Sequence, residues 1–91
     1  MENEINTAAL AVCKNICQIF KAETGESISF SPPHKSERAN VITLEFYIED
    51  LSFGWGIKLS IDFVLKWEYI AIARSAVYKQ IVDAYKKKIS A

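Results

Sequence analysis

The two cysteines and the one histidine of this sequence, Cys13, Cys17 and His34, are the side chains best suited to bind a zinc ion, and a cysteine can also act as a nucleophile. The two cysteines are four residues apart in a segment with helical periodicity, so they lie on neighbouring turns of one side of that helix. A disulfide between them would be strained and would close almost no loop. A zinc site needs about four donors, and this set falls short of that number. We therefore expect reduced cysteines that pack as small apolar side chains, and no metal or other cofactor.

Catalytic motifs are also missing from the sequence. His34 is the one histidine, and acid–base or nucleophilic catalysis needs a partner group that its neighbours in the sequence do not supply. Neither a glycine-rich phosphate loop nor a G-x-S-x-G elbow occurs. A chain this short has few ways to assemble a preorganised active site, so we predict that the protein is not an enzyme and has no catalytic residues.

The segment Phe53-Gly54-Trp55-Gly56 is the first candidate for a binding surface. Glycines on both sides of a tryptophan loosen the backbone and remove side chains that would cover the ring, and tryptophan is enriched at binding hot spots. We expect a bend here that leaves Phe53 and Trp55 near the tip of a hairpin, where they would contact a partner protein. The alternative is that Trp55 folds back and caps the core.

A second candidate is the segment 32–40, which we expect to be a loop. Two prolines stiffen its entry, and His34, Lys35 and Arg38 lie in a stretch with no apolar side chain larger than alanine after those prolines. These three side chains are candidate contacts to a partner. The alternative is an ordinary solvated connection between two strands.

The solvent-facing side of the expected sheet is a third candidate. Its acidic bias could dock a basic partner, and an unpaired edge strand could accept a second copy of the chain. Taken together, the predicted partner-binding residues are Phe53, Trp55, Tyr47, Glu45, Glu49, His34, Lys35 and Arg38.

Basic residues are concentrated near the end of the sequence and suggest an alternative function, binding of nucleic acid. A lysine cluster at the end of a helix is also explained by its favourable interaction with the helix dipole. If Arg74 is buried, we expect a carboxylate partner for it, because an unpaired buried charge is costly. The candidate nucleic-acid contacts are Arg74, Lys79, Lys86, Lys87 and Lys88.

The spacing of apolar residues indicates the elements that must position these side chains. Residues 5–23 show helical spacing, and residues 27–31 resemble a short strand that ends at two prolines. Residues 41–49 and 55–63 alternate apolar and polar side chains, which predicts an antiparallel hairpin with one buried face. That face would hold Ile42, Leu44, Phe46, Ile48, Ile57, Leu59, Ile61 and Phe63.

Residues 62–89 allow two interpretations. We prefer a helix that begins at Asp62, although it leaves Leu65 and Ile72 pointing outward and places Arg74 within an apolar stripe. The alternative makes residues 65–73 a fourth strand, which would need a tight turn that the sequence does not provide. The predicted fold is therefore α+β, a three-stranded antiparallel sheet with an N-terminal and a C-terminal helix packed on one face.

Composition predicts one domain, residues 1–91, with 51% hydrophobic and 24% charged residues and no net charge. Residues 1–50 carry four basic against eight acidic side chains, a net charge of −4, and residues 51–91 carry seven against three, a net charge of +4. We expect the two halves to attract each other as they pack.

Composition also bears on location and function. No apolar run approaches the roughly 20 residues that span a bilayer, and the acidic first residues do not resemble a signal peptide, so we expect a cytoplasmic protein without membrane contact. The sequence predicts a small non-enzymatic module, an inhibitor or adaptor, that occupies a surface of a partner protein. A homodimer is compatible with this prediction, and nucleic-acid binding is less favoured because the net charge is zero.

Overall fold

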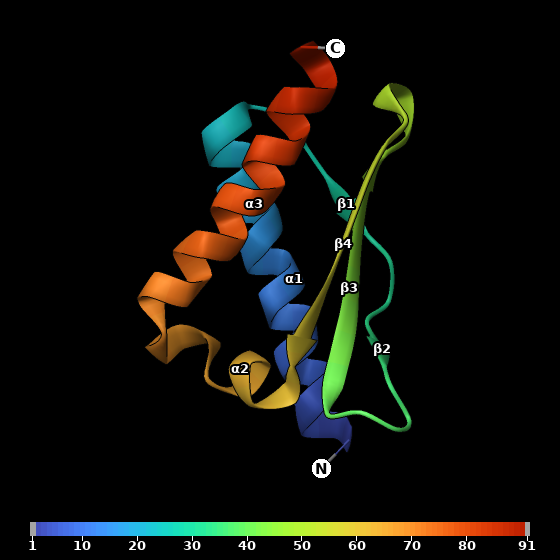
Figure 1. The fold of residues 1–91 in the computed structure, drawn as a ribbon, viewed down its shortest axis with the longest axis vertical. Coiled ribbons are helices and arrows are strands. Elements are labelled where there is room, and N and C mark those ends of the chain that lie inside the picture. Colours follow the sequence, from blue (N-terminus) through green and yellow to red (C-terminus); the bar gives the residue numbers. More distant parts are fainter. Residues whose placement is uncertain (1, 91) are drawn as a thin grey trace.

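The structure is a computed structural model that describes residues 2–90. Two long helices, α1 (Glu2–Thr24) and α3 (Ala71–Ser90), lie on the same face of an antiparallel sheet (Figure 1). The predicted α+β class, with an N-terminal and a C-terminal helix on one face, is confirmed. Neither helix within residues 2–90 is long and apolar enough to cross a membrane.

The sheet is organised around β3 (Val41–Ile48), its central strand. Along one side, β3 pairs over its whole length with β4 (Phe53–Ser60). Along its other side, it pairs with two short strands, β1 (Ser29–Phe30) and β2 (His34–Lys35). The sheet therefore has a fourth strand, as the alternative interpretation held, but this strand is His34–Lys35 in the expected loop. Residues 65–73 are helical rather than extended, apart from the connections at 66 and 70.

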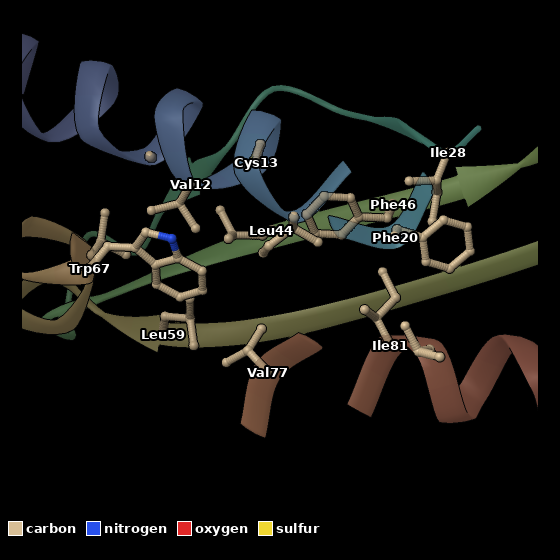
Figure 2. Packing of buried hydrophobic residues seen from close by; sticks show 14 of the residues in the cluster. Val12, Cys13, Phe20, Ile28, Leu44, Phe46, Leu59, Trp67, Val77 and Ile81 are labelled. Atoms are coloured by element: carbon tan, nitrogen blue, oxygen red, sulfur yellow. The ribbon is translucent and has the colours of Figure 1, made fainter. Parts of the chain in front are cut away.

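The apolar face of the β3–β4 hairpin is the floor of the core. In the register of the pair, Ile42 lies opposite Leu59, and Phe46 lies opposite Trp55. Alternate side chains of β3 are buried, which confirms the period of two expected from the sequence. Figure 2 shows side chains of α1, such as Phe20, and of α3, such as Ile81, closing over this face.

The hairpin turn differs from the expected one. The chain reverses through a 3₁₀ turn, η1 (Glu49–Leu51), and through Ser52, which has a left-handed φ of 49°. Phe53 is already the first residue of β4, and the two glycines beside Trp55 lie within the strand. The expectation that the glycines form the bend is therefore wrong; Phe53 pairs with Ile48 beside the turn, and Trp55 lies within the strand.

The connection from β4 to α3 is a corner made of two short helical segments. The first, α2 (Ile61–Leu65), begins at Ser60, whose hydroxyl oxygen accepts a hydrogen bond of 3.1 Å from the backbone N–H of Phe63. The second is η2 (Trp67–Tyr69), and α3 starts only two residues later. The predicted continuous helix from Asp62 is wrong, because the chain must reverse direction so that α3 runs back along the sheet (Figure 1).

Candidate functional site

The corner between β4 and α3 is the most apolar exposed region of the described chain. Four of the eight large apolar side chains that are exposed within residues 3–90 fall in a stretch of eight residues. Tyr69 is 84% exposed and Ile72 is 89% exposed, so both side chains are almost fully surrounded by water. We call this surface the corner patch, defined as Leu65, Tyr69, Ile70 and Ile72.

The corner patch is exposed because neighbouring residues take the buried positions. Val64 of α2 and Trp67 of η2 point into the core, with exposed fractions of 2% and 6%. Leu65 lies between these two residues and points the other way, and Tyr69 follows Trp67 at the end of η2, so both Leu65 and Tyr69 are left in solvent. Large contiguous apolar patches on a protein surface mark sites of protein interaction, ligand binding or membrane contact.

A cleft of about 570 Å³ opens beside the corner patch, between α1, η2 and α3. Its α1 wall includes the small side chains of Ala8 and Ala11, so the helices leave space between them. Leu65 and Tyr69 of the corner patch line the rim of the same cleft. Leu65 and Tyr69 therefore belong both to the corner patch and to the rim of the cleft.

A hydrogen-bonded cluster forms the floor of the cleft. The Oδ1 atom of Asn15 accepts a hydrogen bond of 2.8 Å from the indole Nε1 of Trp67 and a second one from the hydroxyl of Tyr78. The guanidinium Nη1 of Arg74 donates a hydrogen bond of 2.8 Å to the backbone carbonyl of Trp67. These bonds tie α1, η2 and α3 together, and Figure 2 shows Trp67 at one end of the core with its indole nitrogen beside α1.

The lining of the cleft contains hydrogen-bond donors of Asn15 and Arg74 as well as the carboxylate of Glu68, which is an acceptor. Because Oδ1 of Asn15 accepts two bonds, the amide nitrogen Nδ2 must present its hydrogens elsewhere. Arg74 is half-buried, and within the described part of the chain no carboxylate lies within ion-pair distance of it. A carboxylate partner was expected only if Arg74 were buried, and this condition is not met; its bond goes to a backbone carbonyl. A carbonyl of a bound molecule would suit the remaining N–H groups.

Phe53 and Trp55 lie on the core side of the sheet. Phe53 is 6% exposed, and its ring packs edge-on against Tyr85 with centroids 5.9 Å apart. Trp55 is half-buried and packs beside Phe46, at a centroid distance of 6.0 Å. Trp55 thus matches the alternative in which it covers the core, and a role for either ring in binding stays a prediction.

The other predicted partner-binding residues are all exposed but do not form one surface. Glu45 and Tyr47 of β3 point to the open face of the sheet, and His34 joins them there because it pairs with Thr43. The remaining three residues lie at the hairpin turn, in β2 and in the loop after β2. They are Glu49, Lys35 and Arg38, respectively.

The candidate nucleic-acid contacts are likewise separated. Arg74 belongs to the cleft, and the amine of Lys79 pairs with the carboxylate of Asp83 at 2.6 Å on the same helix. The three lysines 86–88 are consecutive, so they point in directions about 100° apart around α3. The structure does not gather these five residues onto one basic surface.

The two cysteines are free thiols, with Cys13 in the core and Cys17 partly buried. Burial, together with the neighbouring Cys17, raises the pKa of the Cys13 thiol to about 12. Burial also raises the pKa of Cys17 above its usual value. Both thiols therefore remain protonated near neutral pH, which makes them poor nucleophiles. Among residues 2–90, no three potential metal ligands from His, Cys, Asp and Glu lie together.

Four residues of this surface were not among the sequence-based candidates: Asn15, Leu65, Ile70 and Ile72. A signal for two of them existed, because the helical interpretation already left Leu65 and Ile72 pointing outward. No protein-family model, curated protein sequence or solved structure matches this chain.

Proposed function

We propose that this protein is a small non-enzymatic binding module, of inhibitor or adaptor type, that acts by occupying a surface of a partner protein. The observation that carries the proposal is the corner patch, where Tyr69 and Ile72 are more than four-fifths exposed. Exposed apolar side chains of this size give up contact with water when a partner covers them, and that burial favours association.

The composition of the surface also supports protein binding. Tyrosine and arginine are enriched among the residues that dominate binding energies, and Tyr69 and Arg74 line the same cleft. An apolar rim around a few polar groups is the usual anatomy of a specific site. A partner that inserted an apolar side chain with an adjacent carbonyl would contact both the apolar rim and the N–H groups of the cleft.

The cleft is held in a fixed shape, which favours binding because little order must be created. Trp67 packs edge-on against Tyr78 at 5.9 Å and beside Phe63 at 5.3 Å, in addition to its bond with Asn15. A preorganised surface loses less conformational entropy on association. The principal contact with the partner is therefore the corner patch, and not the hairpin or the loop expected from the sequence. It retains the cytoplasmic location expected from the sequence.

Site-specific photocrosslinking tests the proposal. A benzophenone amino acid replaces Ile72 in one variant and Gln80, an exposed residue of the same helix, in a matched control. Each variant is irradiated in cytoplasmic extract of cells that express the protein. We expect a discrete crosslinked species of higher mass from position 72 and none from position 80.

Specificity is established by competition. An excess of unlabelled wild-type protein should abolish the crosslinked species, whereas an excess of the Tyr69→Ser variant should compete far less well. The proposal fails if position 72 yields no discrete species, or if positions 72 and 80 yield the same ones.

A further inference from the structure

The two edges of the sheet differ in how they are protected. On one side of β3, the edge consists of two strands of two residues each, separated by a segment with two prolines. On the other side, the edge is β4, which runs for eight residues without interruption. Short edge strands and prolines are devices that prevent other chains from pairing with a sheet, and β4 has neither.

The direction of the backbone groups along β4 follows from the bonds on the other side of β3. The N–H groups of Ser31 and Ser36 donate to the carbonyls of Glu45 and Val41, so odd-numbered residues of β3 turn their backbone toward β1 and β2. Even-numbered residues of β3 therefore turn toward β4, where they pair with its odd-numbered residues. The backbone groups of Gly54, Gly56 and Lys58 must point away from the sheet.

These outward groups have no partners in the described chain. β4 pairs with β3 alone, and no turn, cap or side-chain hydrogen bond within residues 2–90 reaches the N–H or C=O of Gly54, Gly56 or Lys58. The two glycines also carry no side chain that could shield the backbone. A long edge strand with one charged residue and free backbone groups is a template for a further strand.

We propose that a second copy of this chain pairs with the edge of β4, antiparallel and about a two-fold axis, so that Gly56 of one copy faces Gly56 of the other. The outward backbone groups must face each other, which requires an even-numbered residue to lie opposite an even-numbered residue. In this register, Lys58 lies opposite Gly54 of the second copy, so the two lysines avoid each other. The two sheets join into one continuous sheet of eight strands.

Side chains favour this register. It places the half-exposed Trp55 beside Ile57 of the second copy on the core side of both sheets, and aromatic pairs with β-branched residues stabilise neighbouring strands. The start of β4 lines a hollow through Phe53, and the end of the second copy's β4 arrives beside this hollow.

The variant Gly56→Lys tests the proposal without disturbing the fold of one copy. A Cβ atom at Gly56 would meet its nearest atoms at 3.7 and 3.8 Å, which is ordinary contact, and one of these atoms belongs to Glu45. The new amine can therefore pair with Glu45 in a single copy. In the dimer, two new amines would face each other across the axis, where like charges are destabilising. The matched control Ser29→Lys makes the same charge change on the exposed surface of β1, at the protected edge.

Sedimentation velocity over a range of concentrations measures the outcome. We expect the wild-type chain of 10.3 kDa to sediment as a dimer at high concentration. The Ser29→Lys control should match it, and Gly56→Lys should bind its copy at least about tenfold more weakly, or roughly 1.4 kcal/mol. An equimolar mixture of Gly56→Lys and Gly56→Glu should restore the dimer, because opposite charges then meet at the axis. Circular dichroism of each variant at low concentration verifies that the single copy is folded.

Three results would overturn the inference. The first is a wild-type protein that stays monomeric at every concentration, which would leave the edge for a strand of a different protein. The second is a dimer that Gly56→Lys and Ser29→Lys affect equally. The third is a dimer that Ile72→Asp abolishes and Gly56→Lys does not, which would show that the copies meet at the corner patch. The crosslinking test of the corner patch does not depend on any of these results.

Discussion

Asn15 joins three helical segments through a single oxygen atom. Its Oδ1 is the acceptor for Trp67 of η2 and for Tyr78 of α3, while Asn15 itself belongs to α1. All three side chains are partly or fully buried, so water cannot easily replace a lost bond. The shape of the cleft therefore depends on this residue more than on any apolar contact at its rim.

We predict that Asn15→Ala lowers the free energy of unfolding by about 2 kcal/mol, because it leaves two part-buried donors without an acceptor. Tyr78→Phe should cost about 1 kcal/mol, since it removes one donor and leaves the bond from Trp67 intact. Urea unfolding followed by tryptophan fluorescence measures both values. Gln18→Ala, an exposed change on the same helix, is the control. An Asn15→Ala variant as stable as this control would contradict the prediction.

The importance of Asn15 could not be predicted from the sequence. Its two donors lie 52 and 63 residues away, and only the packing of α1 against the corner brings them together. The buried cysteine was predictable, because Cys13 lies in the apolar stripe of a regular helix. Arg74 is half-buried, so the carboxylate expected for a buried arginine is not required, and its hydrogen bond goes to a carbonyl of the local turn.

At the scale of elements, the hairpin turn contains the one non-glycine residue within residues 2–90 that adopts a left-handed backbone conformation. Ser52 has a φ of 49°, and its backbone N–H donates to the carbonyl of Glu49 at 3.0 Å. A serine in this region is strained, because its Cβ approaches the following carbonyl oxygen. Asparagine adopts the same conformation more readily.

We predict that Ser52→Asn raises the free energy of unfolding by about 0.5 kcal/mol, since the strain at this position is roughly 1 kcal/mol and asparagine relieves part of it. Thermal unfolding by circular dichroism at a fixed protein concentration measures the change. Ser52→Ala keeps the Cβ and loses the polar group, so it should not be more stable than the wild type. A Ser52→Asn variant less stable than Ser52→Ala would contradict the prediction.

Strand β3 was predictable, because a period of two has one solution once one face is buried. Its partner was predicted at 55–63 but is β4 at 53–60, so Ile61 and Phe63 belong to α2 and not to the hairpin, and β2 lies in the expected loop. The turn at residues 49–52 contains no glycine or proline, so the bend was predicted at the nearby glycines 54 and 56 instead. Both glycines lie within β4 on the solvent-facing side of the sheet, where no side chain is needed for the core. The corner was missed because helical periodicity does not show where a helix must stop and reverse.

At the scale of the whole molecule, the opposite charges of the two halves do not hold it together through ion pairs. Within the described residues, the structure contains one ion pair, Lys79 with Asp83, and both partners are exposed on α3. The expected attraction between residues 1–50 and 51–91 is therefore not expressed as contacts. One apolar cluster from both helices and the sheet supplies the stability instead.

We predict that raising NaCl from about 0.05 to about 0.5 M changes the free energy of unfolding by less than about 1 kcal/mol, because salt screens exposed charges and leaves apolar burial intact. Urea unfolding at the two salt concentrations measures the difference. Lys79→Gln, which breaks the one ion pair, should be within about 0.5 kcal/mol of the wild type. A loss of several kcal/mol in high salt would show that attraction between the halves does contribute.

The placement of both terminal helices on one face was predictable, because a half-apolar sheet needs one covering layer and the chain has two long helices to form it. The corner patch was not, since the exposure of Tyr69 and Ile70 depends on the direction in which the chain leaves α2. A surface that forms where the chain reverses depends on the three-dimensional fold and is not visible in the local sequence pattern.

The two prolines between β1 and β2 set a limit on growth. A sheet with an unprotected margin on both sides can add neighbours repeatedly and elongate into a fibre. A sheet with one unprotected margin has none left after two molecules have joined. Because Pro32 and Pro33 interrupt one margin, an assembly built on the other stops at two members.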